Sequence, residues 1–319
     1  MEIKNIGIIG AGTMGSAIAY LMAYNGLNVK LVDVDTKTVE RGISNIRKIS
    51  EMQIGFNKRR PEKEISRIEK LGIKLTEEQK DTIKKSMDSI YDEKMEDSIM
   101  GRIRPTESYS ELSQCQVVIE VAFENMTVKK GIIEKLNPIM KEDAILASNS
   151  SSLSVTEMSK NFSHPENFIL THFFNPPYTL PLVEIVRGMM TSENTFNETI
   201  NFFKSLRNHR GPMKPVAVKE VPGFLVNRIL VPMINEAFMM LDENVASARD
   251  IDEAMKAGAG MPMGPLELAD MVGIDVTYDV MEILYREYGD SKYRPSILLK
   301  KYKNAGKLGR KNGNGVYDY

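Results

Sequence analysis

The sequence predicts an α/β domain with a Rossmann-type, mostly parallel sheet, followed by an all-α domain. Two observations predict this order. The chain opens as strand, glycine-rich turn and helix, and strand signals then alternate with helical segments as far as residue 186. Beyond Pro222 the apolar residues recur at helical spacing only. The 319 residues suffice for two ordinary domains, which we place at residues 1–219 and 220–319.

The opening segment predicts a βαβ unit. A short apolar strand covers residues 4–9 and runs directly into the turn GAGTMG. The mostly apolar residues 16–24 predict a helix, and Gly26 supplies its stop. A second strand, residues 29–32, ends at Asp33. This is the context that the dinucleotide-binding fingerprint requires.

Residues 36–110 predict a helical arm that projects from the sheet. The strand pattern disappears there, and more than half of residues 58–97 are charged, about twice the chain average of 27%. We expect an amphipathic helix over residues 61–71 and a second helix further on, in which Ile83, Met87 and Ile90 share one face.

Two local signals separate the helices of the arm. Gly72 breaks the helical pattern after the first helix. Thr76 and Gln79 have the spacing of a capping box, in which each side chain satisfies a backbone N–H group of the other residue. The second helix is therefore expected to begin at Thr76.

The remaining strands of the sheet are expected at residues 117–121, 144–147, 168–171 and 182–186, with a helix at 129–140 between the first two. Such alternation of strands and helices is typical of a parallel sheet.

In the second domain, the first expected helix covers residues 224–241. Ser247 and Asp250 predict the cap of the next helix, which we expect to end before Gly258. The domain boundary is expected at residues 219–223, where the segment VKEVPGF interrupts the periodicity.

Composition excludes several classes of function. The chain has 42 basic and 43 acidic residues, so no net field draws it to nucleic acid or to an anionic membrane. The single cysteine, Cys115, cannot form an internal disulfide, and His164, His172 and His209 are too dispersed to suggest a metal site. No secretory signal and no apolar run of the ~20 residues that span a bilayer are present. We expect a metal-free, cytoplasmic protein.

The glycine-rich turn predicts a dinucleotide site. Gly10 allows the tight turn, Gly12 lets the backbone approach a pyrophosphate, and Gly15 lets helix and strand pack closely. Thr13 and Met14 lie between the last two glycines, at the start of the helix, where free N–H groups and the helix dipole favour an anion. We expect all five residues to contact the cofactor.

Asp33 predicts which dinucleotide binds. It follows the second strand at the distance from the glycines where a carboxylate accepts hydrogen bonds from the adenosine ribose. The same carboxylate would repel a 2′-phosphate. The sequence therefore predicts NAD rather than NADP.

Six further motifs carry a family resemblance. In order they are SNSSSLSVTEM, THFFNPPYTLPLVEIVRG, VPGFLVNRILVPMINEA, AMKAGAGMPMGPLELAD, GDSKYRP and GRKNGNGVYDY. Together with residues 1–35 they make the chain resemble the 3-hydroxyacyl-CoA dehydrogenases, in particular the bacterial 3-hydroxybutyryl-CoA dehydrogenases. The resemblance implies NAD-dependent oxidation of (S)-3-hydroxyacyl-CoA to 3-oxoacyl-CoA and the reverse, with 3-hydroxybutyryl-CoA and acetoacetyl-CoA as the expected pair.

The resemblance also implies the catalytic residues. His172, in HFFNP, corresponds to the general base that acts on the 3-hydroxyl, and Glu184, in LVE, to the glutamate that orients it. A histidine suits this step because its unperturbed pKa lies near neutrality, and a carboxylate on the other ring nitrogen stabilises the imidazolium. Ser151 and Asn227 match residues that hydrogen-bond the reacting oxygen or the thioester carbonyl.

By the same resemblance, further residues should lie near the cofactor: Ser151, Glu124, Lys129, Arg187 and Lys311. The family also implies an acyl-CoA substrate and a homodimer formed through the helical domain. The apolar segment INEAFMMLDE fits a dimer surface, but a buried core would explain it equally well.

Some readings stay open. A β-hydroxyacid dehydrogenase would rely on a catalytic lysine, which His172 and Asn227 oppose, and a non-catalytic NAD-binding protein could share the scaffold. In the arm, Lys58, Arg59 and Arg60 are either contacts for the phosphates of coenzyme A or a solvated helix end. His209 lies in an apparent insertion and receives no role.

Overall fold

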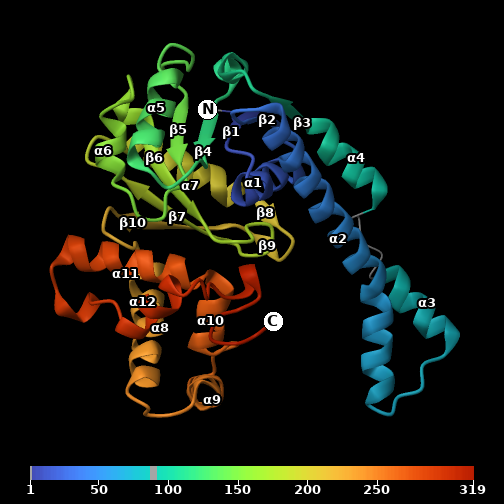
Figure 1. Cartoon of the computed structure of the whole chain (residues 1–319). Coiled ribbons are helices and arrows are strands. Elements are labelled where there is room, and N and C mark those ends of the chain that lie inside the picture. The colour runs from blue at the N-terminus through green and yellow to red at the C-terminus, as the bar shows by residue number, and fades with distance from the viewer. Residues whose placement is uncertain (1, 87–91) are drawn as a thin grey trace. The chain divides into compact units, whose positions relative to one another are not determined.

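The computed structural model describes residues 2–86 and 92–319, and contacts divide the chain into two compact units (Figure 1). The first unit contains residues 1–150 and 154–217, and the second contains residues 151–153 and 218–319. Within the described residues, no helix is both long and apolar enough to cross a membrane.

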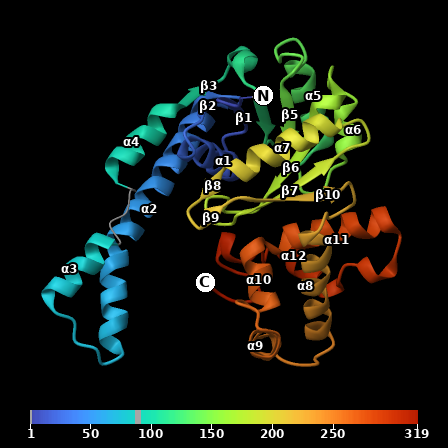
Figure 2. The same ribbon diagram turned by 180° about the vertical axis from the view of Figure 1, so that it is seen from behind.

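An eight-stranded sheet forms the centre of the first unit, with strand order β10-β7-β6-β5-β4-β1-β2-β3 (Figures 1 and 2). Strands β1 to β6 pair in parallel, and β7 pairs antiparallel with β6. This confirms the predicted Rossmann-type sheet. The strands are β1 (Asn5–Ile9), β2 (Asn28–Val32), β3 (Ile103–Thr106), β4 (Val117–Glu120), β5 (Ile145–Ser148), β6 (Phe168–Phe173), β7 (Leu182–Arg187) and β10 (Lys214–Lys219).

Several helices of this unit bury apolar side chains in one shared core. Ile18 and Leu21 of α1, Ile46 of α2 and Phe203 of α7 all belong to it. Figure 2 shows α7 lying across the face of β6 and β7. These elements are α1 (Thr13–Tyr24), α5 (Met126–Leu136), α6 (Val155–Ser159), α7 (Glu193–Ser205), the hairpin strands β8 (Arg207–Asn208) and β9 (Gly211–Pro212), and short 3-10 helices at Tyr109–Gln114 and Pro165–Asn167.

The arm contains a longer first helix than the sequence predicts. α2 (Thr36–Lys70) passes through Pro61 without a break, so a helix start at residue 61 was wrong. A proline removes one backbone hydrogen bond, but buried isoleucines hold the helix on both sides of it, Ile46 and Ile54 before the proline and Ile65 after it.

The end of α2 and the start of α3 (Glu77–Ser86) follow the predicted signals. Gly72 has a φ of +83° and separates the helices. The main-chain N–H of Thr76 donates to Gln79 Oε1 at 2.9 Å, and the N–H of Gln79 donates to Thr76 Oγ1 at 3.2 Å, which confirms the capping box. The expected extension of this helix to Met87 and Ile90 lies outside the described residues.

Two strands of the sheet were missed. β3 follows α4 (Glu93–Arg102) inside the segment predicted to be helical, and it pairs with β2 at the edge of the sheet. Its sequence, IRPT, does not alternate, and its Pro105 is tolerated because an edge strand has a partner on one side only. β10 occupies the other edge and has only one buried residue, so its sequence pattern is equally weak.

The second unit is helical, as predicted. It contains α8 (Val226–Asp242), α9 (Ala248–Ala259), α10 (Pro265–Val272), α11 (Ile274–Tyr288), α12 (Ile297–Asn304) and short 3-10 helices at Ser291–Tyr293 and Arg310–Asn312. Ser247 caps α9 by accepting from the N–H of Asp250. The helix continues past Gly258 and ends at Gly260, whose φ is +67°, so the predicted end was too early.

The segment INEAFMMLDE belongs largely to the core of this unit. Ile234 and Phe238 are fully buried, and Met240 and Leu241 pack against the same core. Of the two explanations of its apolar residues, the intramolecular core therefore holds for these four side chains.

Candidate active site

Chemically distinctive residues gather at the carboxyl edge of the parallel sheet. The glycine-rich turn follows β1, Asp33 follows β2, and Glu120, Ser148 and His172 lie at or next to the carboxyl ends of β4, β5 and β6. In open parallel sheets this edge is where ligands bind.

The three glycines of the turn meet three different environments. A Cβ atom on Gly10, whose φ is +106°, would lie 2.7 Å from the carbonyl oxygen of Val121, and one on Gly15 would lie 1.7 Å from the carbonyl oxygen of Gly10. These two positions are closed by packing. A Cβ on Gly12 would meet no described atom within 4 Å, so the space beside this residue is open.

That open space lies at the N-terminus of α1. Gly12 is the N-cap residue, and among the described residues no side-chain hydrogen bond caps this end of the helix. Thr13 and Met14 form the first turn. The arrangement fits a dinucleotide, because the pyrophosphate needs both a close backbone approach and free N–H groups.

Asp33 is tied to the glycine-rich turn. Its Oδ2 accepts the N–H of Ala11 at 2.6 Å, and its Oδ1 accepts the N–H of Val34 at 2.7 Å. The carboxylate is therefore held beside the turn at the end of β2. Direct binding of a ribose by Asp33 stays a prediction.

His172 and Glu184 form a buried pair. They stand opposite each other in the antiparallel ladder of β6 and β7, and Nδ1 of His172 lies 2.7 Å from Oε2 of Glu184. His172 is 6% exposed and Glu184 is fully buried. An ionised carboxylate can only accept hydrogen bonds, so this contact places the ring proton of the neutral imidazole on Nδ1. Nε2 is then the nitrogen that can take up another proton.

Glu124 and Lys129 lie together next to the end of β4. Lys129 is 1% exposed, and its Nζ lies 2.7 Å from Oε1 of Glu120 and 3.7 Å from Oε2 of Glu124. Ser150 donates to Oε1 of Glu124 at 2.7 Å. The ammonium of Lys129 is thus enclosed by protein, and a direct contact with the cofactor stays a prediction.

The other expected cofactor residues are exposed and paired. Arg187, at the end of β7, forms an ion pair with Glu193 and lies 5.3 Å from the centre of the Phe196 ring. Lys311, in the second unit, forms an ion pair with Asp275. Neither contact excludes a role at the cofactor, because exposed ion pairs exchange partners at little cost.

Ser151 and Asn227 belong to the second unit, whereas His172 and Glu184 belong to the first. Asn227 lies in the first turn of α8 and is half-buried. Ser151 directly follows Ser150 in the loop after β5. Their approach to the histidine pair stays a prediction.

The basic cluster of the arm is partly neutralised. Lys58 forms an ion pair with Glu93 at 2.6 Å, and Nε of Arg59 donates to the carbonyl oxygen of Gly55 at 2.9 Å. Arg60 is exposed. Contacts of these residues with coenzyme A stay a prediction.

Comparison with known proteins decides the family. The profile described as "3-hydroxyacyl-CoA dehydrogenase, NAD binding domain" matches residues 5–221, and the profile described as "3-hydroxyacyl-CoA dehydrogenase, C-terminal domain" matches residues 223–319. The chain belongs to the 3-hydroxyacyl-CoA dehydrogenase family. The resemblance inferred from the six motifs is confirmed, and so is the NAD-binding character of the first domain.

Relatives within the 3-hydroxyacyl-CoA dehydrogenases match over the whole chain. A 3-hydroxybutyryl-CoA dehydrogenase from Bradyrhizobium diazoefficiens is 40% identical over 318 residues, covering 99% of this chain and 96% of the relative. The crystal structure of (S)-3-hydroxybutyryl-CoA dehydrogenase PaaH1 from Ralstonia eutropha has a TM-score of 0.80 at 41% identity, covering 100% and 99% of the two chains. FadB2 of M. tuberculosis has a TM-score of 0.81 at 31% identity, covering 100% of both.

Two polar residues at this edge of the sheet were not predicted from the sequence. Glu120 is buried at the end of β4, and Oδ1 of Asn149 accepts the N–H of Phe173, next to His172, at 2.9 Å. A signal for Glu120 existed, since it ends the otherwise apolar run VVIE. Asn149 gave none, because a single asparagine in a serine-rich loop is ordinary turn chemistry.

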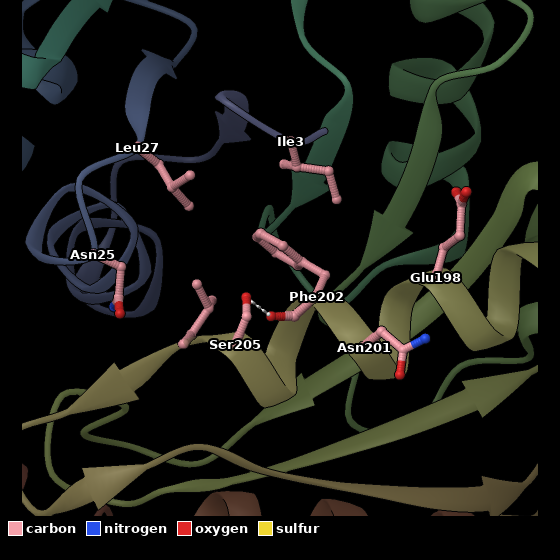
Figure 3. A pocket seen from close by; sticks show the side chains of 8 residues that line it. Ile3, Asn25, Leu27, Glu198, Asn201, Phe202 and Ser205 are labelled. Atoms are coloured by element: carbon pink, nitrogen blue, oxygen red, sulfur yellow. Dashed lines mark hydrogen bonds between the residues drawn. The ribbon is translucent and has the colours of Figure 1, made fainter. Parts of the chain in front are cut away.

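A cavity lies away from this edge, near the starts of β1 and β2 (Figure 3). It measures about 440 Å³ and lies between α7 and the residues that precede the two strands. The Asn25 amide at its wall donates to the carbonyl oxygens of Leu21 and Arg207, and Ser205 donates to the carbonyl oxygen of Phe202. These polar groups serve the fold itself.

Proposed function

We propose that the protein oxidises (S)-3-hydroxyacyl-CoA to 3-oxoacyl-CoA with NAD and catalyses the reverse reduction, with 3-hydroxybutyryl-CoA and acetoacetyl-CoA as its substrate pair. The observation that carries the proposal is the buried contact of 2.7 Å between His172 and Glu184 in a chain of this family. The names of the relatives support the short acyl chain.

His172 is proposed as the general base. Nε2 takes the proton of the 3-hydroxyl during oxidation and returns it during reduction. Glu184 holds Nδ1–H, keeps the ring in the tautomer that leaves Nε2 able to accept, and stabilises the imidazolium that forms. Because Glu184 is fully buried, its attraction for the imidazolium is weakly screened by solvent.

NAD, when bound, supplies the nicotinamide ring that accepts the hydride from C3. The first unit fits this cofactor at the open space beside Gly12 and at the N–H groups of Thr13 and Met14. Asp33 is proposed to accept from the adenosine ribose and to disfavour a 2′-phosphate, and its position beside the glycine-rich turn supports this. Glu124, Lys129, Ser151, Arg187 and Lys311 are proposed to complete the surroundings of the cofactor.

Ser151 and Asn227 are proposed to hydrogen-bond the reacting oxygen or the thioester carbonyl. Their chemistry supports this, since a hydroxyl and an amide can donate to oxygen without changing charge. Residues 1–219 are proposed as the NAD-binding domain and residues 220–319 as the substrate and dimerisation domain.

The proposed assembly is a homodimer through the helical domain. Several large apolar side chains of that unit are exposed, among them Ile229 (73%), Met271 (51%) and Val276 (45%). Where such exposed apolar residues form a contiguous patch, the patch often marks a contact with a partner. Sedimentation of the wild type and of Ile229→Asp tests this, and a monomeric wild type would refute it.

Absorbance at 340 nm tests the proposed reaction. Purified protein is mixed with acetoacetyl-CoA and NADH, and with NADPH in a parallel sample. Rapid loss of NADH and slow loss of NADPH are expected. A folded protein that binds NADH but oxidises neither cofactor would favour a non-catalytic protein on this scaffold, whereas a preference for NADPH would reject the role given to Asp33.

A further inference from the structure

The carboxylate of Glu120 is buried at the end of a strand whose other residues are all apolar. β4 reads VVIE, all four residues are buried, and Glu120 is 2% exposed. An ionised carboxylate is costly at such a position unless charge and hydrogen bonds compensate it. The protein retains it next to the glycine-rich turn, at the edge where the cofactor is proposed to bind.

Both oxygens of Glu120 are fully used. Oε1 accepts from Nζ of Lys129 at 2.7 Å and from the N–H of Ala122 at 2.6 Å. Oε2 accepts from the same Nζ at 2.9 Å and from Oγ of Ser148 at 2.7 Å. The carboxylate therefore joins the turn after β4, helix α5 and the end of β5.

The contacts continue from this pair to the proposed site. Lys129 reaches Glu124, which accepts from Ser150, the residue before Ser151. The main-chain oxygen of Glu120 accepts the N–H of Asn149 at 2.8 Å, and the side chain of Asn149 accepts from Phe173. The buried ion pair thus reaches Glu124 and the serine-rich turn, while the main chain of Glu120 connects through Asn149 to the strand end that carries His172.

We propose that Glu120 is a positioning residue, which holds Lys129 and the turn of residues 148–150 in the arrangement that cofactor binding and the reaction require. It touches neither cofactor nor substrate and acts through these neighbours. The proposal rests on the proposed function for its kinetic consequence, but its effect on NADH affinity is independent of the substrate.

The test compares Glu120→Gln with Glu120→Gln/Lys129→Met. The single change keeps the size of the side chain but leaves the buried ammonium of Lys129 with only the more distant carboxylate of Glu124, at 3.7 Å, whereas the double change removes both charges of the Glu120–Lys129 pair. Glu157→Gln is the matched control. Glu157 pairs with Lys130, the neighbour of Lys129 in helix α5, at 2.8 Å in a half-exposed ion pair. Each variant is measured by thermal unfolding, by NADH fluorescence titration, and by kcat and KM.

We expect Glu120→Gln to melt at a lower temperature, to bind NADH at least tenfold more weakly and to lose at least tenfold in kcat. The double variant is expected to regain the wild-type melting temperature but not the NADH affinity, because the turn of residues 148–150 has lost the Glu120 carboxylate and Lys129, itself proposed to lie near the cofactor, is absent. The control should match the wild type in all measurements. If Glu120→Gln does not fold, Ser148→Ala carries the test, because it removes the hydrogen bond between Glu120 and the turn and leaves Lys129 in place.

Two results would overturn the proposal. One is wild-type NADH affinity in the double variant, which would leave the pair of Glu120 and Lys129 a purely structural role. The other is an unchanged NADH affinity in a folded Glu120→Gln variant. A wild-type protein without activity on acetoacetyl-CoA would instead refute the proposed substrate, while the NADH titration would still decide the role of Glu120.

Discussion

The Nε2 atom of His209 lies 2.8 Å from the hydroxyl oxygen of Tyr20, although 189 positions separate the two residues. His209 stands in the turn between β8 and β9, and its main-chain N–H donates to the carbonyl oxygen of Tyr178. Burial lowers the pKa of His209 to about 4. The imidazole therefore stays neutral in the folded protein far below the pH at which a free histidine is protonated.

This shift makes stability depend on pH. Between pH 6.5 and 4 the unfolded chain binds a proton at residue 209 and the folded chain does not, so acid favours unfolding. We expect this site to remove about 1–2 kcal/mol from the free energy of unfolding as pH falls through this range, less than the full shift implies because the ring is partly exposed. Urea unfolding at pH 7 and pH 4.5 measures it.

His209→Gln is expected to flatten this pH dependence, since the substituted side chain does not titrate. His164→Gln serves as the control, because His164 is a half-exposed histidine of the same unit. An equal pH slope in wild type and His209→Gln would show that other groups govern acid stability.

The histidine pair predicts a separation of binding from turnover. His172→Ala should lower kcat at least ~100-fold, the range typical of a lost general base, and leave the NADH affinity within about twofold. Glu184→Gln should lower kcat less, because the base remains but its imidazolium loses a charged partner. Steady-state kinetics and NADH titration measure both effects, and an active His172→Ala enzyme would remove the proposed base.

The glycine-rich turn predicts opposite effects from one methyl group at two positions. Gly12→Ala fills open space, so the protein should melt normally but bind NADH at least tenfold more weakly. Gly15→Ala forces a Cβ into the carbonyl oxygen of Gly10 and should lower the melting temperature strongly. Normal NADH affinity in Gly12→Ala would argue against a pyrophosphate at this turn.

Asp33 predicts cofactor choice. Asp33→Ser removes the negative charge beside the turn, so KM for NADH should rise while the discrimination against NADPH falls by about tenfold or more. The ratio of kcat/KM for the two cofactors measures this. An unchanged ratio would mean that other residues exclude the 2′-phosphate.

The sequence predicted features that depend on local rules. The opening βαβ unit, the capping box of Thr76 and Gln79, and the separation at Gly72 each follow from a few adjacent residues. The continuity of α2 through Pro61 could not be predicted in this way, because buried contacts on both sides of the proline maintain it.

In the candidate site, too, some features could be predicted from local sequence and others depend on tertiary contacts. Motifs indicated His172 and Glu184, and the strand register explains why they meet. The pair of Glu120 with Lys129 and the contact of His209 with Tyr20 depend on which elements the fold brings together. Such contacts cannot be predicted from the residue types or their spacing in a single sequence.

The antiparallel pairing of β6 with β7 has a consequence for evolution. Because the proposed base and its carboxylate are opposite members of one ladder, a slip of one residue would turn Glu184 to the other face of the sheet. The apolar neighbours in that ladder, such as Val183 and Ile185, are fully buried and oppose such a slip. Selection for activity therefore also preserves the alignment of these two strands.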